Sequence, residues 1–277
     1  MPEKNINIYG QVVIVGFAGM LAWWLFININ SYQNTTNNFL YGAVLGLLPV
    51  MASLFGFINA KKWGGFSSVM GRATIFLSTG LLMWGLGTLI FAYYNIVLNV
   101  EVPYPSIADA FYIVSWPLWA MSMINLSRAT GARFQLKKIS GRLALLIIPL
   151  IIMGVSYYVL IVVARGGISY LSAGNLVKTF FDLAYPVGDV VILTIALLIF
   201  GLSLNYLGGR FKWPILLLIM GFVMNYFADF AFSYTTTKGT YFVADWVDLI
   251  FTITFFLLGL GVSLLGPTRD KSKIISS

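Results

Sequence analysis

"FVADWVDLIFTITFFLLGLGVSLL", residues 242–265, is the stretch that decides the fold class of this chain. Its two charged residues, Asp245 and Asp248, stand near its start, and the residues from 249 to 265 carry no charge. A helix of about 20 apolar residues crosses a bilayer core about 30 Å thick. The apolar residues run continuously instead of alternating, which favours a helix over a barrel strand. The stretch therefore predicts a transmembrane helix.

The rest of the chain repeats this pattern. Its 277 residues are 59% hydrophobic and 9% charged, far from the roughly 25% charged of soluble domains. Apolar runs bounded by charges, prolines and polar loops lie at 9–29, 39–59, 73–97, 107–127, 143–164, 186–206, 214–234 and 242–265. We expect an all-α integral membrane protein, a bundle of about eight transmembrane helices. It would form one domain over 1–266, with a short basic cytoplasmic tail over 267–277.

Two segments, the first apolar run and residues 172–186, set further expectations. No small-residue cleavage pattern follows the first apolar run, so we expect this run to be retained as a helix instead of removed as a signal peptide. The polar segment 172–186 is too polar to span a membrane, and its pattern predicts a short interfacial or re-entrant helix ahead of the sixth span. The lipid bilayer, which the predicted spans cross, is the first predicted partner of the chain.

The basic residues predict the orientation in the membrane. With the N-terminus in the cytoplasm, fourteen of the seventeen lie inside: Lys4, Lys61, Lys62, Arg72, Arg128, Arg133, Lys137, Lys138, Arg142, Arg210, Lys212, Arg269, Lys271 and Lys273. Lys/Arg-rich short loops stay cytoplasmic, so we expect a multi-pass protein of the cell membrane with both termini cytoplasmic. The net charge of +8 reflects this bias and attraction to anionic lipid headgroups, and does not indicate nucleic acid.

The acidic residues gather on the opposite side. Under the same topology seven of the nine lie outside or at the outer ends of helices: Glu101, Asp109, Asp182, Asp189, Asp229, Asp245 and Asp248. Acidic residues contribute little to topology, so insertion does not explain the asymmetry. Ionisable residues at membrane depth usually face a bundle interior or a water-filled cavity. The asymmetry favours one outward-facing anionic pocket, with separate helix caps and interfacial hydration as the alternative.

Local patterns support the two readings to different degrees. Ser106 and Asp109 have capping-box spacing, and Pro186 near a helix start would put Asp189 in a first turn, where the helix dipole favours an anion. Asp229 fits no cap, because it lies near a helix C-terminal end and four residues after Asn225. The candidate ligand-binding residues are Asp109, Asp189, Asp229, Asp245, Asp248, Tyr104, Tyr185 and Asn225. Lys178 would pair with Asp182 or reach into the pocket as a counter-ion.

Several classes of chemistry are not expected. The chain has no cysteine and no histidine, which removes thiol chemistry, the usual general base and the commonest metal ligands. "YPVGD", residues 185–189, resembles the G-x-G-D element of membrane aspartyl proteases, but Pro186 replaces its first glycine. A retinal protein would need Lys178 as the Schiff-base lysine, and Lys178 lies outside the predicted spans. We expect neither an enzyme nor a bound metal or cofactor.

Two segments of the sequence share the same residues at their two ends. "YPSIADAFYIVSWPLWAMSMINLSR", residues 104–128, aligns with "YPVGDVVILTIALLIFGLSLNYLGGR", residues 185–210, if one gap is allowed, and the C-terminal run is a looser third copy. The first two phrases each begin with Tyr-Pro and an acid and end with Asn and Arg. The pattern predicts repeated helical hairpins, which would bring the carboxylates together at one end of the bundle.

"VPYPSIADAFYIVSWPL", "DLAYPVGDVVIL" and "ADFAFSYTTTKGTYFVADWVDLIF" carry a family resemblance, in the same order over residues 70–265. They resemble the polytopic membrane input regions that precede GGDEF diguanylate cyclase, EAL phosphodiesterase and some histidine kinase domains in bacteria and archaea. The resemblance implies a sensor of extracellular or membrane-borne signals. This chain ends twelve residues after its last span, so we expect no output domain of its own and a protein partner at the basic cytoplasmic face.

Three functions follow as hypotheses. The leading one is a multi-pass sensor or binding module whose outward anionic pocket takes a cation, an amine, another small ligand or a proton, and which signals through a partner. The second is a cation- or proton-coupled transporter, although transporters usually place coupling residues near the bilayer midplane. The third is a structural or accessory subunit of a larger membrane complex.

Overall fold

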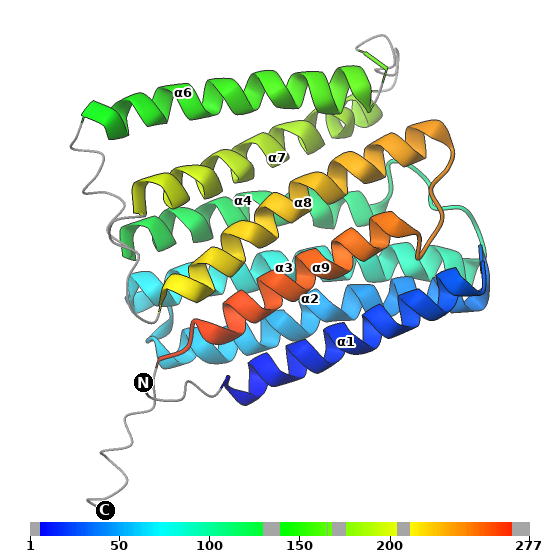
Figure 1. Cartoon of the computed structure of the whole chain (residues 1–277), viewed down its shortest axis with the longest axis horizontal. Coiled ribbons are helices and arrows are strands. Elements are labelled where there is room, and N and C mark those ends of the chain that lie inside the picture. Colours follow the sequence, from blue (N-terminus) through cyan, green and yellow to red (C-terminus); the bar gives the residue numbers. More distant parts are fainter. Residues whose placement is uncertain (1–5, 130–138, 165, 168–175, 204–210, 268–277) are drawn as a thin grey trace, which may run out of the picture.

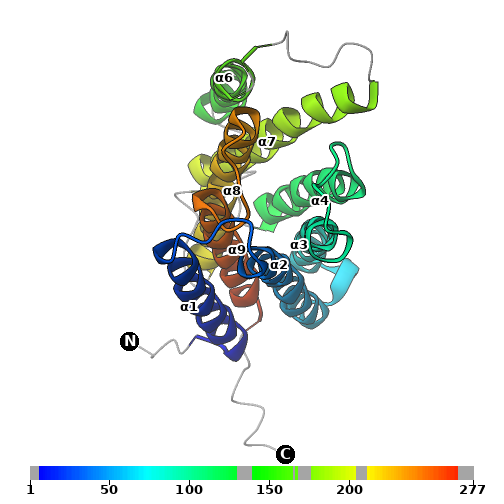
Figure 2. The same cartoon turned by 90° about the vertical axis from the view of Figure 1, so that its right-hand side faces the viewer.

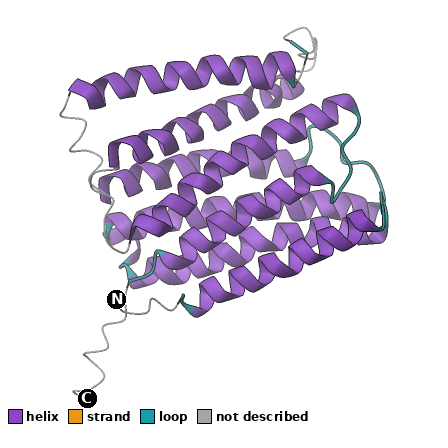
Figure 3. Cartoon of the chain, in the orientation of Figure 1, coloured by secondary structure: helices purple, strands orange, loops and turns teal. Residues whose placement is uncertain are grey.

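The computed structural model of the chain is all-helical over the residues it describes, 6–129, 139–164, 166–167, 176–203 and 211–267 (Figure 3). The helices are α1 (Ile8–Ile29), α2 (Thr36–Lys62), α3 (Val69–Tyr93), α4 (Ile107–Ala129), α6 (Ile139–Ser156), α7 (Leu176–Ser203), α8 (Lys212–Lys238) and α9 (Trp246–Leu264). One π-helical turn, Tyr94–Leu98, extends α3, and another, Tyr157–Val163, extends α6. Within the described residues, eight helical stretches are long and apolar enough to span a membrane, which confirms the predicted multi-pass membrane protein.

The helices run side by side in alternating directions (Figure 1). The connections 30–35, 99–106 and 239–245 meet at one end of the bundle, on the right of Figure 1, which we call the acidic end. The described chain begins and finishes at the other end, the basic end, where the Asn7 side chain donates a hydrogen bond to the carbonyl oxygen of Ser263. Because residues 7 and 263 lie together at this end, the described chain agrees with an even number of spans.

Contacts between helices distant in sequence give the bundle its shape. The C-terminal helix α9 packs against α1, α2 and α8, and α7 packs against α4, α6 and α8. Figure 2 shows α6 at the edge of the bundle, beside α7. Exposed apolar side chains such as Leu146 and Leu150 cover α6, as expected for a helix that faces lipid.

A tryptophan cluster forms the centre of the packing. Trp84 of α3 stacks on Trp119 of α4 with ring centroids 5.2 Å apart, and it also contacts Phe251 and Phe255 of α9. The Trp119 ring passes over Gly80, where any Cβ would collide with it. A side chain at residue 80 would therefore push α3 and α4 apart.

The structure corrects the expectation for 172–186. From Leu176 onward this segment belongs to α7, a single helix of 28 residues with Pro186 inside it. Proline removes only one backbone donor and tolerates a helix interior when neighbouring helices pack around it. Asp189 consequently lies at the middle of α7, whereas Asp109 lies in the first turn of α4. The helix-dipole explanation for Asp189 is therefore wrong, and the two aligned phrases differ in their place along the helix.

Candidate functional site

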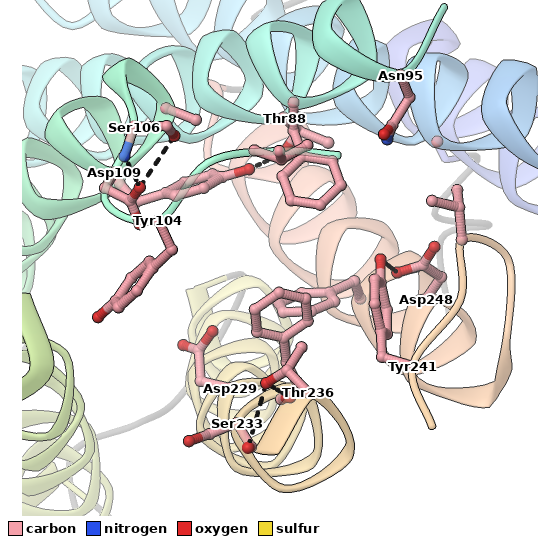
Figure 4. A pocket seen from close by; sticks show the side chains of 18 of the residues that line it. Thr88, Asn95, Tyr104, Ser106, Asp109, Asp229, Ser233, Thr236, Tyr241 and Asp248 are labelled. Carbon is pink, nitrogen blue, oxygen red and sulfur yellow. Dashed lines mark hydrogen bonds between the residues drawn. The ribbon is translucent and has the colours of Figure 1, made fainter. Parts of the chain in front are cut away.

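A cavity of about 890 Å³ lies at the acidic end, between α3 and α4 on one side and α7, α8 and α9 on the other. Figure 4 shows Thr88 and Asp109 on the first wall, and Asp229, Tyr241 and Asp248 on the facing wall. Acidic side chains from both walls and from the 99–106 connection line it: Glu101, Asp109, Asp189, Asp229 and Asp248. We call this space the acidic cavity.

Asp109 is held on its wall by a local turn and by a second helix. Its Oδ2 accepts hydrogen bonds from the Ser106 backbone N–H at 2.6 Å and from the Ser106 hydroxyl at 2.9 Å. The expected reach of Asp109 back to the start of the helix is therefore present, but the serine donates to the carboxylate instead of capping the helix. Asp109 Oδ1 accepts a 2.6 Å hydrogen bond from Tyr185 of α7. The Asp109 carboxylate thus joins α4 to α7.

Asp248 closes the opposite wall. Its Oδ2 accepts the backbone N–H of Ala244 at 2.7 Å, and its Oδ1 accepts the Tyr241 hydroxyl at 3.2 Å. Burial raises the pKa of Tyr241, in the connection ahead of α9, well above its ordinary value, so this phenol stays a neutral donor. The carboxylate therefore orders the connection that forms the rim of the cavity.

Side chains of α1 and α2 fix the same connection from behind. The Trp24 indole donates to the carbonyl oxygen of Asp245 at 2.8 Å, Asn28 donates to that of Ala244, and Asn38 donates to that of Val243. Buried backbone carbonyls need such partners. These hydrogen bonds from α1 and α2 hold the rim of the cavity in place without a ligand.

Asp189 and Asp229 form a pair between α7 and α8. Their side chains are hydrogen-bonded to each other, and Asn225 donates a 2.7 Å hydrogen bond to Asp229 Oδ2. The sequence spacing had placed Asn225 and Asp229 on one helix face, and this hydrogen bond confirms it. Asp229 lies nine residues before Lys238, the last residue of α8, about 14 Å along the helix axis. The pair is therefore deeper in the bundle than Asp109.

Two of the predicted site residues do not line the cavity. Asp245 is the N-cap of α9, where its side chain accepts the backbone N–H groups of Val247 and Asp248, so its carboxylate is turned toward its own helix. Burial raises the pKa of Asp245 to about 6, and the hydrogen bonds to its carboxylate oppose the rise. Asn225 is buried behind Asp229 and contributes only through it.

The remaining predicted residues do line the cavity. Tyr104 and Tyr185 are part of its wall, together with Lys178, whose ammonium nitrogen lies 6.0 Å from the centre of the Tyr104 ring. Lys178 therefore reaches the cavity, as the expectation of a counter-ion requires, and that role stays a prediction. The alternative partner, the Asp182 side chain, lies outside what the structure describes. Lys178 is the single basic residue lining the cavity within the described part of the chain.

Other lining residues were not in the predicted site. They are neutral polar or aromatic side chains that membrane helices also carry for packing: Trp84, Thr88, Asn95, Tyr112, Ser233, Thr236, Tyr241, Phe251 and Phe255. Thr88 and Asn95 are seven residues apart, which places them on one face of α3 and its π-helical extension. That spacing was the available signal, but on its own it does not separate a cavity wall from a helix contact.

The cavity places aromatic rings beside its carboxyl groups. No group of three or more acidic, histidine or cysteine side chains in the described residues is placed to hold a metal. Trp84 and Tyr112, with ring centroids 4.8 Å apart, and Phe251 instead put aromatic rings beside the carboxylates. Aromatic faces attract cations within about 6 Å of the ring centroid, and the volume of the cavity is typical of small-molecule sites.

Comparison of the chain with models of known protein families, with curated proteins and with solved structures finds no match. The resemblance to membrane sensor regions therefore stays a prediction, as does every function inferred from it.

Proposed function

We propose that this protein is a multi-pass receptor that binds a small organic cation in the acidic cavity and signals through a partner protein at its basic end. The observation that carries the proposal is the lining of the cavity, which combines carboxyl groups with aromatic rings in about 890 Å³. Carboxylates supply the charge that a cation needs, and the rings attract it and exclude water. Such a volume is far larger than an inorganic ion requires.

Charge distribution supports a defined sidedness. Lys61, Lys62 and Arg72 lie around the connection of α2 to α3 at the basic end, and Arg128 and Lys212 lie in the terminal turns of α4 and α8 at that same end. By the positive-inside rule this end is cytoplasmic. In the cell membrane the acidic cavity would then face outward and take its ligand from outside, and the basic end would meet the partner.

The construction of the walls supports a sensing role. Asp109 belongs to α4, Asp229 to α8 and Asp248 to α9. A ligand bound between these three carboxyl groups would therefore contact three different helices. A ligand shifts a conformational equilibrium by its difference in affinity between two states. A cation that draws these carboxylates together would favour the state with the walls closer.

Thermal unfolding of the detergent-purified protein tests the proposal. Choline and its uncharged carbon isostere dimethylbutanol have the same shape, so their difference isolates the cationic charge. A ligand at about 100 times its dissociation constant stabilises by about 2.7 kcal/mol. We expect stabilisation by choline alone, reduced in both Asp109→Asn and Asp248→Asn. Equal effects of the two compounds, or none from a wider panel of amines, would contradict the proposal and favour an accessory subunit.

One observation favours a cation- or proton-coupled transporter as the second candidate. Asp189 lies at the middle of α7 and is paired with Asp229 of α8, and transporters keep coupling residues near the bilayer midplane. Uptake of labelled choline into proteoliposomes, abolished by Asp229→Asn, would establish transport. Saturable binding without uptake would leave the receptor as the function.

A further inference from the structure

The hydrogen bond between Asp189 and Asp229 implies a proton. An ionised carboxylate only accepts hydrogen bonds, so two carboxyl groups bond to each other only when one of them carries a proton. Carboxyl groups in such contact share one proton because two like charges at that distance do not both ionise. Asp189 is buried, and both side chains line the acidic cavity.

Helix packing builds this pair. The Trp116 ring of α4 lies directly on Gly188, leaving no room there for a Cβ, and this contact sets the rotation of α7 next to Asp189. On α8, Asn225 holds Asp229 from the turn before it. Three helices therefore fix the geometry of the two carboxyl groups.

The amide that supports the pair has an acceptor without a partner. Asn225 is 3% exposed, and its Oδ1 has no hydrogen-bond partner within the part of the chain that the structure describes. A buried acceptor without a partner costs free energy. This oxygen belongs to the same amide that holds Asp229, so a donor or a cation brought beside that amide would satisfy it.

The charged and titratable groups around the pair are mostly acidic or phenolic. They come from α7, α8, α4, α9 and the connections at the acidic end: Lys178, Tyr185, Tyr226, Asp109, Tyr112, Asp248, Tyr241, Glu101 and Tyr104. Lys178 is the one described cation among them, and its ammonium nitrogen lies over Tyr104. Full ionisation of the pair would thus add a second negative charge to a wall that is already anionic.

We propose that the Asp189–Asp229 pair is a proton–cation exchange site, in which an organic cation entering the acidic cavity displaces the shared proton. Before binding, the pair carries one proton and one negative charge. On binding, the remaining O–H bond breaks, the proton passes to water, and the cation takes its place beside two carboxylates. The net charge of pair plus occupant is the same before and after. This inference rests on the proposed function, because it concerns regulation of the same cavity.

Infrared spectroscopy tests the proton without any ligand. A protonated carboxyl group has a C=O stretching band distinct from that of a carboxylate. We expect this band in the wild type at neutral pH and its loss in both Asp189→Asn and Asp229→Asn. Asp109→Asn serves as the control, because Asp109 is held by the donors Ser106 and Tyr185 and has no carboxyl partner in the pair. A wild-type spectrum without the band would overturn the inference and leave the proposed cation binding untouched.

Calorimetry tests the exchange. Choline is permanently charged, so any proton released on titration comes from the protein, and heats measured in buffers of different ionisation enthalpy count it. We expect release of about one proton per choline bound, and binding that weakens by about tenfold for each pH unit of acidification while the pair is protonated. Asp229→Asn and Asp189→Asn, which each remove the shared proton, should release none.

The possible outcomes separate the two claims. Choline binding with no proton release and no pH dependence in the wild type would overturn the exchange and keep the proposed function. A wild type that binds neither choline nor any other amine would overturn both. Retained binding in Asp189→Asn with proton release abolished would support both, since it also shows that the variant is folded.

Discussion

At the scale of the residue, three buried aspartates near the same rim have different partners and therefore different roles. Asp109 and Asp248 line the cavity and also join elements, because Asp109 accepts from Ser106 and Tyr185, and Asp248 accepts from a backbone N–H and Tyr241. Asp245 is the N-cap of α9, and its carboxylate accepts backbone N–H groups of the first turn. The nearby hydrogen-bond donors therefore determine which carboxylates can contact a ligand in the cavity.

Asp245 should give the protein a measurable pH dependence. Burial raises its pKa from 3.8 to about 6 in the folded protein, so the folded state binds more protons than the unfolded state between these values. The free energy of unfolding should therefore fall as the pH rises from about 4 to about 6 and stay lower above that range. Asp245→Asn keeps a capping side chain and should remove this contribution.

Thermal unfolding of wild type and variant across this pH range is the measurement. Asp245→Ala separates the two effects, because it loses the helix cap as well as the titrating group. Its free energy of unfolding should be about 1 kcal/mol lower than that of Asp245→Asn at every pH. Identical slopes in the wild type and Asp245→Asn would contradict the assignment.

At the scale of the element, α7 decides the shape of the site. It continues through Pro186 as one helix, and its close approach to α4 depends on Gly188, whose missing side chain makes room for Trp116. Tyr185, next to this contact, donates to Asp109 from the same helix. The position of Asp189 is thus a consequence of helix packing and not of a helix terminus.

Gly188→Ala should therefore destabilise the protein. Its Cβ would overlap the Trp116 ring, and overpacking of this kind costs about 1–3 kcal/mol. Gly19→Ala on α1 is the matched control: nothing lies within 4 Å of its Cβ, so replacing a helical glycine there should be neutral or slightly stabilising. Thermal unfolding of both variants checks the pair of expectations. Equal stability of the two would mean that α4 and α7 do not meet at residue 188.

At the scale of the whole molecule, the sequence predicts the number of spans because each apolar run reports its own length and hydropathy. It does not predict which helices pack together, since the contact of α9 with α1 and α2, or of α4 with α7, depends on how side chains fit across helices. The same limit applies to the site. Spacing within one helix predicted the Asn225 and Asp229 contact, whereas the pairing of Asp189 with Asp229 needed the rotation of two helices.

The sidedness of the molecule is testable because the chain contains no cysteine. Single cysteines at exposed positions, Gln33→Cys at the acidic end and Ser67→Cys at the basic end, report each end separately. We expect a membrane-impermeant thiol reagent to label Gln33→Cys in intact cells, and Ser67→Cys only after permeabilisation. The opposite pattern would place the acidic cavity in the cytoplasm.

The most direct test of the cation site is the equilibrium affinity for choline of wild type, Asp248→Asn and Asp245→Asn. Asp248 lines the acidic cavity and Asp245 does not, although they are three residues apart and both are buried. A close charge that is lost from a binding site costs about 1.4 kcal/mol or more, a factor of ten in affinity. We predict an affinity at least about tenfold weaker for Asp248→Asn and unchanged for Asp245→Asn. Equal loss in both variants, or no choline binding by the wild type, would contradict the acidic cavity as the site of binding.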